Sequence, residues 1–163
     1  VTGVQTCPLP ISHVVRVLSA GHTSSGHPYL VMELLRGADL KQRLQAGPLP
    51  SAEVVEIVRQ LAAALGAAHR AGITHRDLKP ANIFLCEGGA PTVKILDFGV
   101  AKVTDSTELA LTQSSAIVGS PYFMSPEQLT SPRLVDHRSD LWSLAVVAYA
   151  CLTGNLPFSG LMK

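Results

Sequence analysis

The sequence has little charge. Lysine, arginine, aspartate and glutamate make up 15% of its 163 residues, and the formal net charge is only +1. A chain so close to neutral offers no electrostatic basis for binding nucleic acid or an acidic membrane surface. Hydrophobic residues reach 47%, which excludes disorder as the main state, because disordered chains are rich in charge and poor in apolar residues. The length suits one domain with an apolar core.

Long hydrophobic runs and paired cysteines are also absent. The longest apolar stretch covers residues 141–152, which is shorter than the roughly 20 residues that span a bilayer, so we expect a buried helix there and no membrane segment within this chain. The three cysteines, Cys7, Cys86 and Cys151, form no C-x-x-C pair, which argues against a zinc site and a disulfide framework. No signal peptide is expected, and the cysteine usage favours a cytoplasmic location.

The first eleven residues, VTGVQTCPLPI, differ from the rest of the chain. They show neither a helix nor a strand period, and Pro8 and Pro10 oppose both elements. The segment closely resembles the translation of a common sequencing-library adapter. We therefore expect residues 1–11 to be a non-native leader; an irregular native arm is the alternative.

The remaining pattern predicts a few strands followed mainly by helices. Strands are expected at 14–20 and 29–34, joined by a turn, and Gly37 is expected to end this region. Asp39 is expected to cap a short helix that runs to Gln45. A long amphipathic helix follows, with Ser51 as its cap and Gly72 just after its end. A second hairpin is predicted at 83–86 and 93–96, and a last helix at 141–152, with Ser139 or Asp140 near its cap and Gly154 at its end. This order indicates an α+β fold.

One central segment combines groups suited to phosphoryl transfer. Residues 75–82 read HRDLKPAN, and residues 97–99 read DFG. Transfer of a γ-phosphoryl group depends on positioning and charge neutralisation more than on covalent chemistry. Asp77 can meet an incoming hydroxyl, and Lys79 can meet the developing phosphate charge. Asn82 and Asp97 offer the hard oxygen ligands that Mg²⁺ prefers. Capping of turns by these polar side chains is the purely structural alternative.

These motifs, together with GSPYFMSPE at 119–127, resemble the eukaryotic-type serine/threonine protein kinase family in its bacterial form. The resemblance covers residues 12–160. It implies a partial protein kinase-like fold, in which residues 12–35 form the end of the N-lobe and the hinge and residues 36–163 form most of the helical C-lobe. It also implies ATP and Mg²⁺ as cofactors, and proteins with serine or threonine as substrates.

The resemblance also assigns roles residue by residue. Asp77 would be the catalytic base, Lys79 would contact the γ-phosphate, and Asn82 and Asp97 would hold Mg²⁺. Met32 would be the gatekeeper, the backbones of Glu33 and Leu35 would face adenine, Phe84 would pack under the ring, and Asp39 would either lie near the ribose or only cap its helix. His75 and Phe98 would stack in the core, and Asp140 would anchor the catalytic loop. Arg76 suggests control by phosphorylation at Thr112 or Ser114, and Ser120 would bridge Asp77 and Lys79.

Several parts of that family's pattern are missing from the sequence. No G-x-G-x-x-G occurs, no lysine-bearing strand precedes Val14, and no later helix supplies an arginine for Glu127. We therefore expect this chain alone to be inactive. A non-catalytic pseudokinase acting as an interaction module is the alternative function, although the four intact catalytic positions argue against it. A small-molecule phosphotransferase is disfavoured by the SPE segment and Ser120. Oligomeric state and a membrane anchor in a parent protein stay open.

Overall fold

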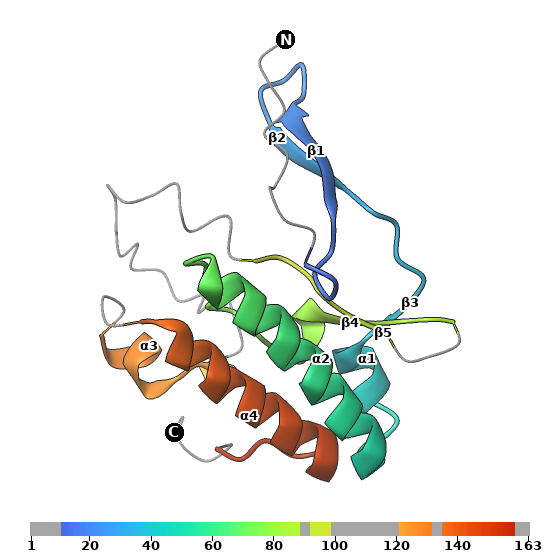
Figure 1. Cartoon of the computed structure of the whole chain (residues 1–163), viewed down its shortest axis with the longest axis vertical. Helices are drawn as coiled ribbons and strands as arrows, with labels where there is room; N and C mark the ends of the chain where they lie inside the picture. The colour runs from blue at the N-terminus through green and yellow to red at the C-terminus, as the bar shows by residue number, and fades with distance from the viewer. Residues whose placement is uncertain (1–10, 89–91, 99–120, 132–134, 159–163) are drawn as a thin grey trace.

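The computed structural model describes residues 11–88, 92–98, 121–131 and 135–158, and these form helices and two small antiparallel sheets. The α+β class expected from the sequence is confirmed (Figure 1). Two helices, α2 (Ser51–Arg70) and α4 (His137–Thr153), pack side by side and form the centre of the body. Within the described residues, no helix is long and apolar enough to cross a membrane.

The predicted N-terminal hairpin is present and projects from the body (Figure 1). Strands β1 (Val17–His22) and β2 (Pro28–Met32) pair antiparallel as a separate two-stranded sheet. Val14, expected at the start of the first strand, instead forms an isolated bridge to Ile95. The hairpin is joined to the body through this bridge and through a hydrogen bond from the Val15 amide to the Ile95 carbonyl, 2.9 Å long.

A three-stranded sheet carries the residues that follow the hairpin. It has the order β3-β4-β5, with β3 at Gly37–Asp39, β4 at Ile83–Cys86 and β5 at Thr92–Ile95. The β4–β5 hairpin was predicted, whereas β3 was not, since Gly37 was expected to end extended structure. Gly37 has φ +138° and pairs with Cys86, and a Cβ added there would lie 2.0 Å from the Leu85 carbonyl oxygen. Glycine is therefore required by the close approach of the two backbones.

The ends of the helices agree with the prediction except at the starts of α2 and α4. Asp39 caps α1 (Leu40–Leu44) by accepting a hydrogen bond from the Gln42 amide, as expected. Helix α2 is preceded by Pro50 and not capped by Ser51, because Ser51 already has helical geometry. Helix α4 begins one turn earlier than expected, with Asp136 as its cap. Gly72 and Gly154 follow the helix ends with φ +75° and +70°, as predicted.

The apolar core lies between α2, α4 and the three-stranded sheet. Leu61 and Leu65 of α2 are fully buried, as are Ile83 of β4, Ile95 of β5 and Val147 of α4. Ile11 packs partly against this core, while residues 1–10 of the expected leader lie outside the described residues. Short elements complete the fold: the 3₁₀ turns η1 (Pro80–Asn82) and η3 (Pro121–Phe123) and the helix α3 (Pro126–Thr130).

Candidate active site

The loop between α2 and η1, which carries Asp77, is held by a carboxylate from α4. Asp140 is 1% exposed, and its two oxygens accept hydrogen bonds from the backbone amides of His75 (2.9 Å) and Arg76 (2.8 Å). The Nε2 of His69, at the end of α2, donates a third bond of 2.7 Å. The geometry expected of Asp140 is therefore present. His69 was not predicted, because nothing in the local pattern marks a contact 71 residues away.

His75 joins this loop to the segment that carries Asp97. Its buried ring donates through Nε2 to the Leu96 carbonyl (3.1 Å) and accepts through Nδ1 from the Asp77 amide (3.2 Å). The ring also meets that of Phe98 edge-on at 4.8 Å, which agrees with the expected stacking of these two side chains. Burial lowers the pKa of His75, so the neutral ring can fill both hydrogen-bonding roles at pH 7.

Two residues of the site have backbone conformations that side-chain-bearing residues seldom adopt. Arg76 has φ +65° and Asp97 has φ +45°, and such positions persist only where the surroundings hold them. Arg76 is held on both sides, since its amide donates to Asp140 and its carbonyl accepts from Gln128 Nε2 at 2.7 Å. Gln128 lies in α3, one residue after the third sequence motif, and was not predicted to contribute.

Asp77, Lys79 and Asn82 form a hydrogen-bonded cluster. The Lys79 ammonium lies 2.8 Å from Asp77 Oδ2, and the Asn82 amide donates to the Asp77 carbonyl (2.8 Å) and to Oδ2 (3.2 Å). The Asp77 and Lys79 side chains are 37% and 21% exposed, so the cluster is held by the fold yet accessible from solvent. A backbone bond from the Leu96 amide to the Asn82 carbonyl, 2.8 Å long, places Asp97 one residue from the same cluster.

The donor groups around this cluster fit a hard divalent cation. Asn82 uses its amide N–H₂ for Asp77, which leaves its side-chain oxygen as a possible ligand. Asp97 adds an exposed carboxylate. Within the described residues there is no group of three or more His, Cys, Asp and Glu side chains that could hold a metal alone. A bound Mg²⁺ would therefore also need phosphate and water oxygens, as this ion commonly does.

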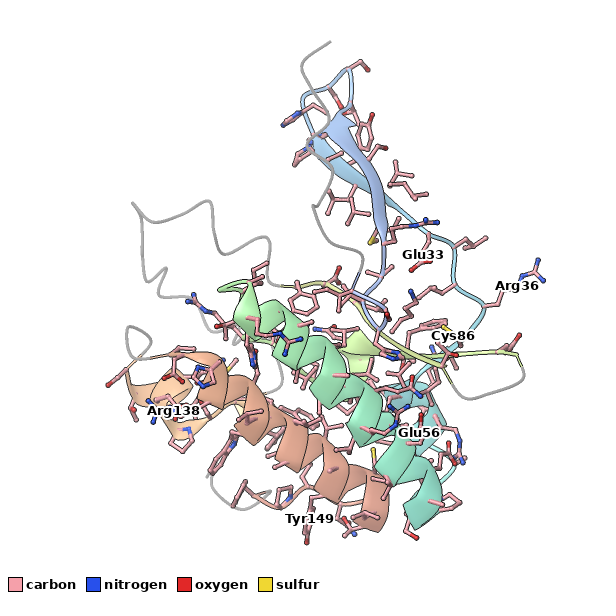
Figure 2. The ribbon with its side chains drawn as sticks, viewed as in Figure 1. Glu33, Arg36, Glu56, Cys86, Arg138 and Tyr149 are labelled. Atoms are coloured by element: carbon pink, nitrogen blue, oxygen red, sulfur yellow. The ribbon has the colours of Figure 1, made fainter. Side chains whose placement is uncertain are left out.

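The segment expected to face adenine follows β2. The Glu33 carboxylate accepts from the Arg16 amide (2.9 Å) and from Lys94 Nζ (2.8 Å), and Lys94 also donates to the Val14 carbonyl (3.2 Å). The bond from Lys94 is the main reason that the pKa of Glu33 is lowered. No hydrogen bond joins the Glu33 carbonyl or either backbone group of Leu35 to another described residue. Figure 2 shows Glu33 at the base of the projecting hairpin. Lys94 was missed by the sequence prediction.

The other residues expected near the nucleotide are placed by the sheet register. Phe84 pairs with Asp39 on one side and with Lys94 on the other, and residues directly opposite one another share a sheet face. Since Ile83 enters the core, the half-buried Phe84 lies on the opposite face, with Lys94. Met32 ends β2 and is 41% exposed. Asp39 is a helix cap, and a contact with ribose stays a prediction.

The residues expected to regulate the site are only partly described. Thr112, Ser114 and Ser120 lie outside the described residues, as does Gly99 of the DFG motif. Arg76 is exposed. Glu127, for which the sequence offers no later arginine partner, accepts a hydrogen bond from Ser139 Oγ of α4, and this bond is the largest cause of its lowered pKa.

Comparisons with known proteins identify the family. A sequence profile described as "Protein kinase domain" matches residues 5–163. The chain belongs to the protein kinase domain family. Serine/threonine-protein kinase Pkn1 of Myxococcus xanthus is 51% identical over 134 residues, which are 81% of this chain and 19% of Pkn1. The bacterial serine/threonine kinase resemblance is thus confirmed.

Solved kinase structures have the same fold. The kinase domain of Mycobacterium tuberculosis PknI matches with a TM-score of 0.71 and 28% identity, over 93% of this chain and 55% of that one. Rad53 in complex with AMP-PNP matches with a TM-score of 0.75 and 31% identity, over 96% of this chain and 38% of that one. The chain spans only 18–33% of the length of the similar curated kinases.

Proposed function

We propose that the protein carrying this chain is an ATP-dependent serine/threonine protein kinase, which transfers the γ-phosphoryl group of ATP to hydroxyl groups of proteins. The observation that carries this proposal is the cluster of Asp77, Lys79 and Asn82, tied through the Leu96 backbone to the segment of Asp97. The presence of all four residues, Asp77, Lys79, Asn82 and Asp97, also argues against a non-catalytic interaction module.

Each residue of the cluster has a role in the reaction. The substrate hydroxyl oxygen attacks the γ-phosphorus, the bond from that phosphorus to the β–γ bridging oxygen breaks, ADP leaves, and the Asp77 carboxylate accepts the hydroxyl proton. Lys79 neutralises Asp77 in the resting site and stabilises charge on the transferring group. Asn82 and Asp97 would hold Mg²⁺, which supplies charge neutralisation for the phosphates.

The nucleotide would lie between the hairpin and the three-stranded sheet. The Glu33 carbonyl and the Leu35 backbone provide one acceptor, one donor and a second acceptor for an adenine edge. Phe84 offers an apolar ring on the sheet face that also carries Lys94. Support comes from Rad53, whose structure is described in complex with AMP-PNP. Met32 and Asp39 would complete this site as the gatekeeper and as a residue near the ribose.

Regulation would act through Arg76. A phosphate on Thr112 or Ser114 would pair with this exposed guanidinium, and Ser120 would contact Asp77 and Lys79. We propose a cytoplasmic location, because ATP is the donor and because Cys86 and Cys151 are free thiols. The segmentation of the chain, with residues 1–11 as a leader, 12–35 as N-lobe and hinge, and 36–163 as C-lobe, is part of the same proposal.

The test is transfer of labelled phosphate from ATP to a generic protein substrate by the purified full-length protein. Asp77→Asn should lower the rate by about 10²–10⁴-fold, the range typical for loss of a general base. Asp136→Asn is the matched control, since it makes the same chemical change at an exposed helix cap and should leave the rate unchanged. Equal rates for Asp77→Asn and the unaltered protein would contradict the assignment.

A further inference from the structure

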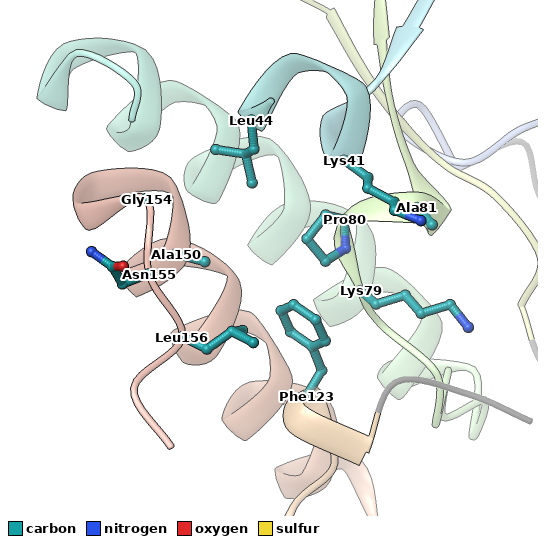
Figure 3. A pocket seen from close by; sticks show the side chains of 10 residues that line it. All are labelled: Lys41, Leu44, Lys79, Pro80, Ala81, Phe123, Ala150, Gly154, Asn155 and Leu156. Carbon is teal, nitrogen blue, oxygen red and sulfur yellow. The ribbon is translucent and has the colours of Figure 1, made fainter. Parts of the chain in front are cut away.

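An open pocket of about 480 Å³ adjoins the proposed catalytic cluster (Figure 3). It lies between α1, the η1 turn and the C-terminal end of α4, and its walls are mostly apolar, with Leu44, Pro80, Phe123 and Leu156 among them. Lys79 belongs to the same lining, and its ammonium is bonded to Asp77. A peptide that presents a hydroxyl to Asp77 would therefore pass the mouth of this pocket.

The charge of the lining is of one sign. Among the described residues that line it, Lys41 and Lys79 are the only charged ones, and none carries a carboxylate. Lys79 is already paired with Asp77. Lys41 is exposed and forms no ion pair with any carboxylate in the part of the chain that the structure describes. Lys41 of α1 and Ala81 of η1 line the same pocket (Figure 3), and the methyl side chain of Ala81 has no polar atom to offer an ammonium.

We propose that this pocket selects protein substrates with an aspartate or glutamate close to the phosphorylated residue, and that Lys41 pairs with that carboxylate. The inference rests on the proposed function and adds a substrate class to it. Apolar walls beside the ammonium exclude part of the water that would screen the pair, so the attraction exceeds that of two fully exposed charges. A basic side chain at the same place meets two like charges and is rejected.

The test compares peptides that differ in one charge. Each has a single serine in a neutral background, with Asp, Asn or Lys placed in turn at every position up to about four residues on either side, a reach of roughly 13 Å for an extended chain. Binding is followed by fluorescence anisotropy without ATP, and phosphorylation by labelled phosphate with ATP. The full-length protein is compared with Lys41→Glu and with Ala81→Glu, which adds a carboxylate to the lining that carries Lys41.

A matched control makes the same change of charge elsewhere. Arg36→Glu alters a side chain that is exposed, lies outside the pocket lining and points away from the body in Figure 2. At one or two positions, Asp should be favoured over Asn by about fivefold in affinity and in kcat/KM, which corresponds to an ion pair at the upper end of the exposed range. Lys41→Glu should reverse this preference, Ala81→Glu should abolish it, and Arg36→Glu should retain it.

The two measurements separate this inference from the proposed function. Phosphorylation without a preference for Asp, or a preference that survives Lys41→Glu, overturns the role of the pocket and leaves the kinase assignment standing. Binding with the Asp preference but without phosphate transfer supports the pocket and overturns the proposed function. Absence of both binding and transfer with every peptide overturns both.

Discussion

Asp140 offers a direct way to test whether α4 holds the proposed catalytic loop, residues 75–82, in place. In Asp140→Asn, one acceptor oxygen becomes an N–H₂ group. If this group replaces Oδ1, it faces the Arg76 amide, 2.8 Å away in the present structure; if it replaces Oδ2, it faces both the His75 amide and His69 Nε2. The first orientation costs less, because a single donor loses its acceptor.

The magnitude follows from burial. A hydrogen bond to a charged group contributes about 1.5–3 kcal/mol, and a buried donor left without an acceptor costs a similar amount. Asp140 also lies in the first turn of α4, where a negative charge adds about 0.3–1 kcal/mol. Relaxation of Arg76 from its strained φ would return part of the loss. We expect Asp140→Asn to lower the free energy of unfolding by about 3 kcal/mol.

Urea denaturation, followed by the fluorescence of Trp142, measures this loss, since Trp142 is the only tryptophan and lies in α4. Asp136→Asn is again the control, and its cost should stay below about 1 kcal/mol because asparagine is as good a helix cap as aspartate. Hydrogen exchange should show that the Arg76 amide loses protection in Asp140→Asn. An equal cost for both variants, with the Arg76 amide still protected, would refute the reasoning.

Three further predictions concern single contacts. Because burial lowers the pKa of His75, the unfolded chain binds more protons than the folded one below about pH 6.5. The free energy of unfolding should therefore fall on acidification below that pH, by at most about 1.4 kcal/mol per pH unit. In urea titrations His75→Gln should flatten this slope, and an unchanged slope in that variant would contradict the prediction. Lys94→Met should raise the pKa of Glu33 toward its usual value, which NMR titration would show. It should also weaken binding of a nucleotide analogue severalfold by loosening the segment after β2, which calorimetry would show. An unchanged Glu33 pKa and an unchanged affinity would contradict this prediction. Gly37→Ala should destabilise by more than about 1 kcal/mol in denaturant, since its Cβ would meet the Leu85 carbonyl; a neutral effect would contradict the required close approach.

Local patterns predicted the central cluster well. The bonds among Asp77, Lys79 and Asn82 join residues two and five positions apart, so the order of residue types along one loop carries the information. The contacts that support this loop were not predictable in this way. His69 meets Asp140 across 71 positions, Gln128 meets Arg76 across 52, and Lys94 meets Glu33 across 61, and only the folded chain brings them together.

The elements of the fold show the same division. The spacing of apolar residues was sufficient to predict α2 and the β4–β5 hairpin, because the hydrophobic period and the turn residues are local signals in the sequence. Strand β3 was missed because three residues have no period of their own and become a strand only by pairing with β4. The start of α4 was placed too late because the apolar run begins at Leu141, whereas the helix also includes a polar first turn that binds the catalytic loop through Asp140.

The two strained residues explain why the site depends on the core. Arg76 and Asp97 have left-handed backbones that cost about 1–3 kcal/mol each and persist only if their neighbours are fixed. Arg76 is fixed by Asp140 and Gln128. The segment of Asp97 is fixed through Leu96, whose amide donates to Asn82 and whose carbonyl accepts from the buried His75. Neither loop can relax without breaking bonds to the other or to α4, so these bonds set the relative position of the proposed base and the proposed magnesium ligands.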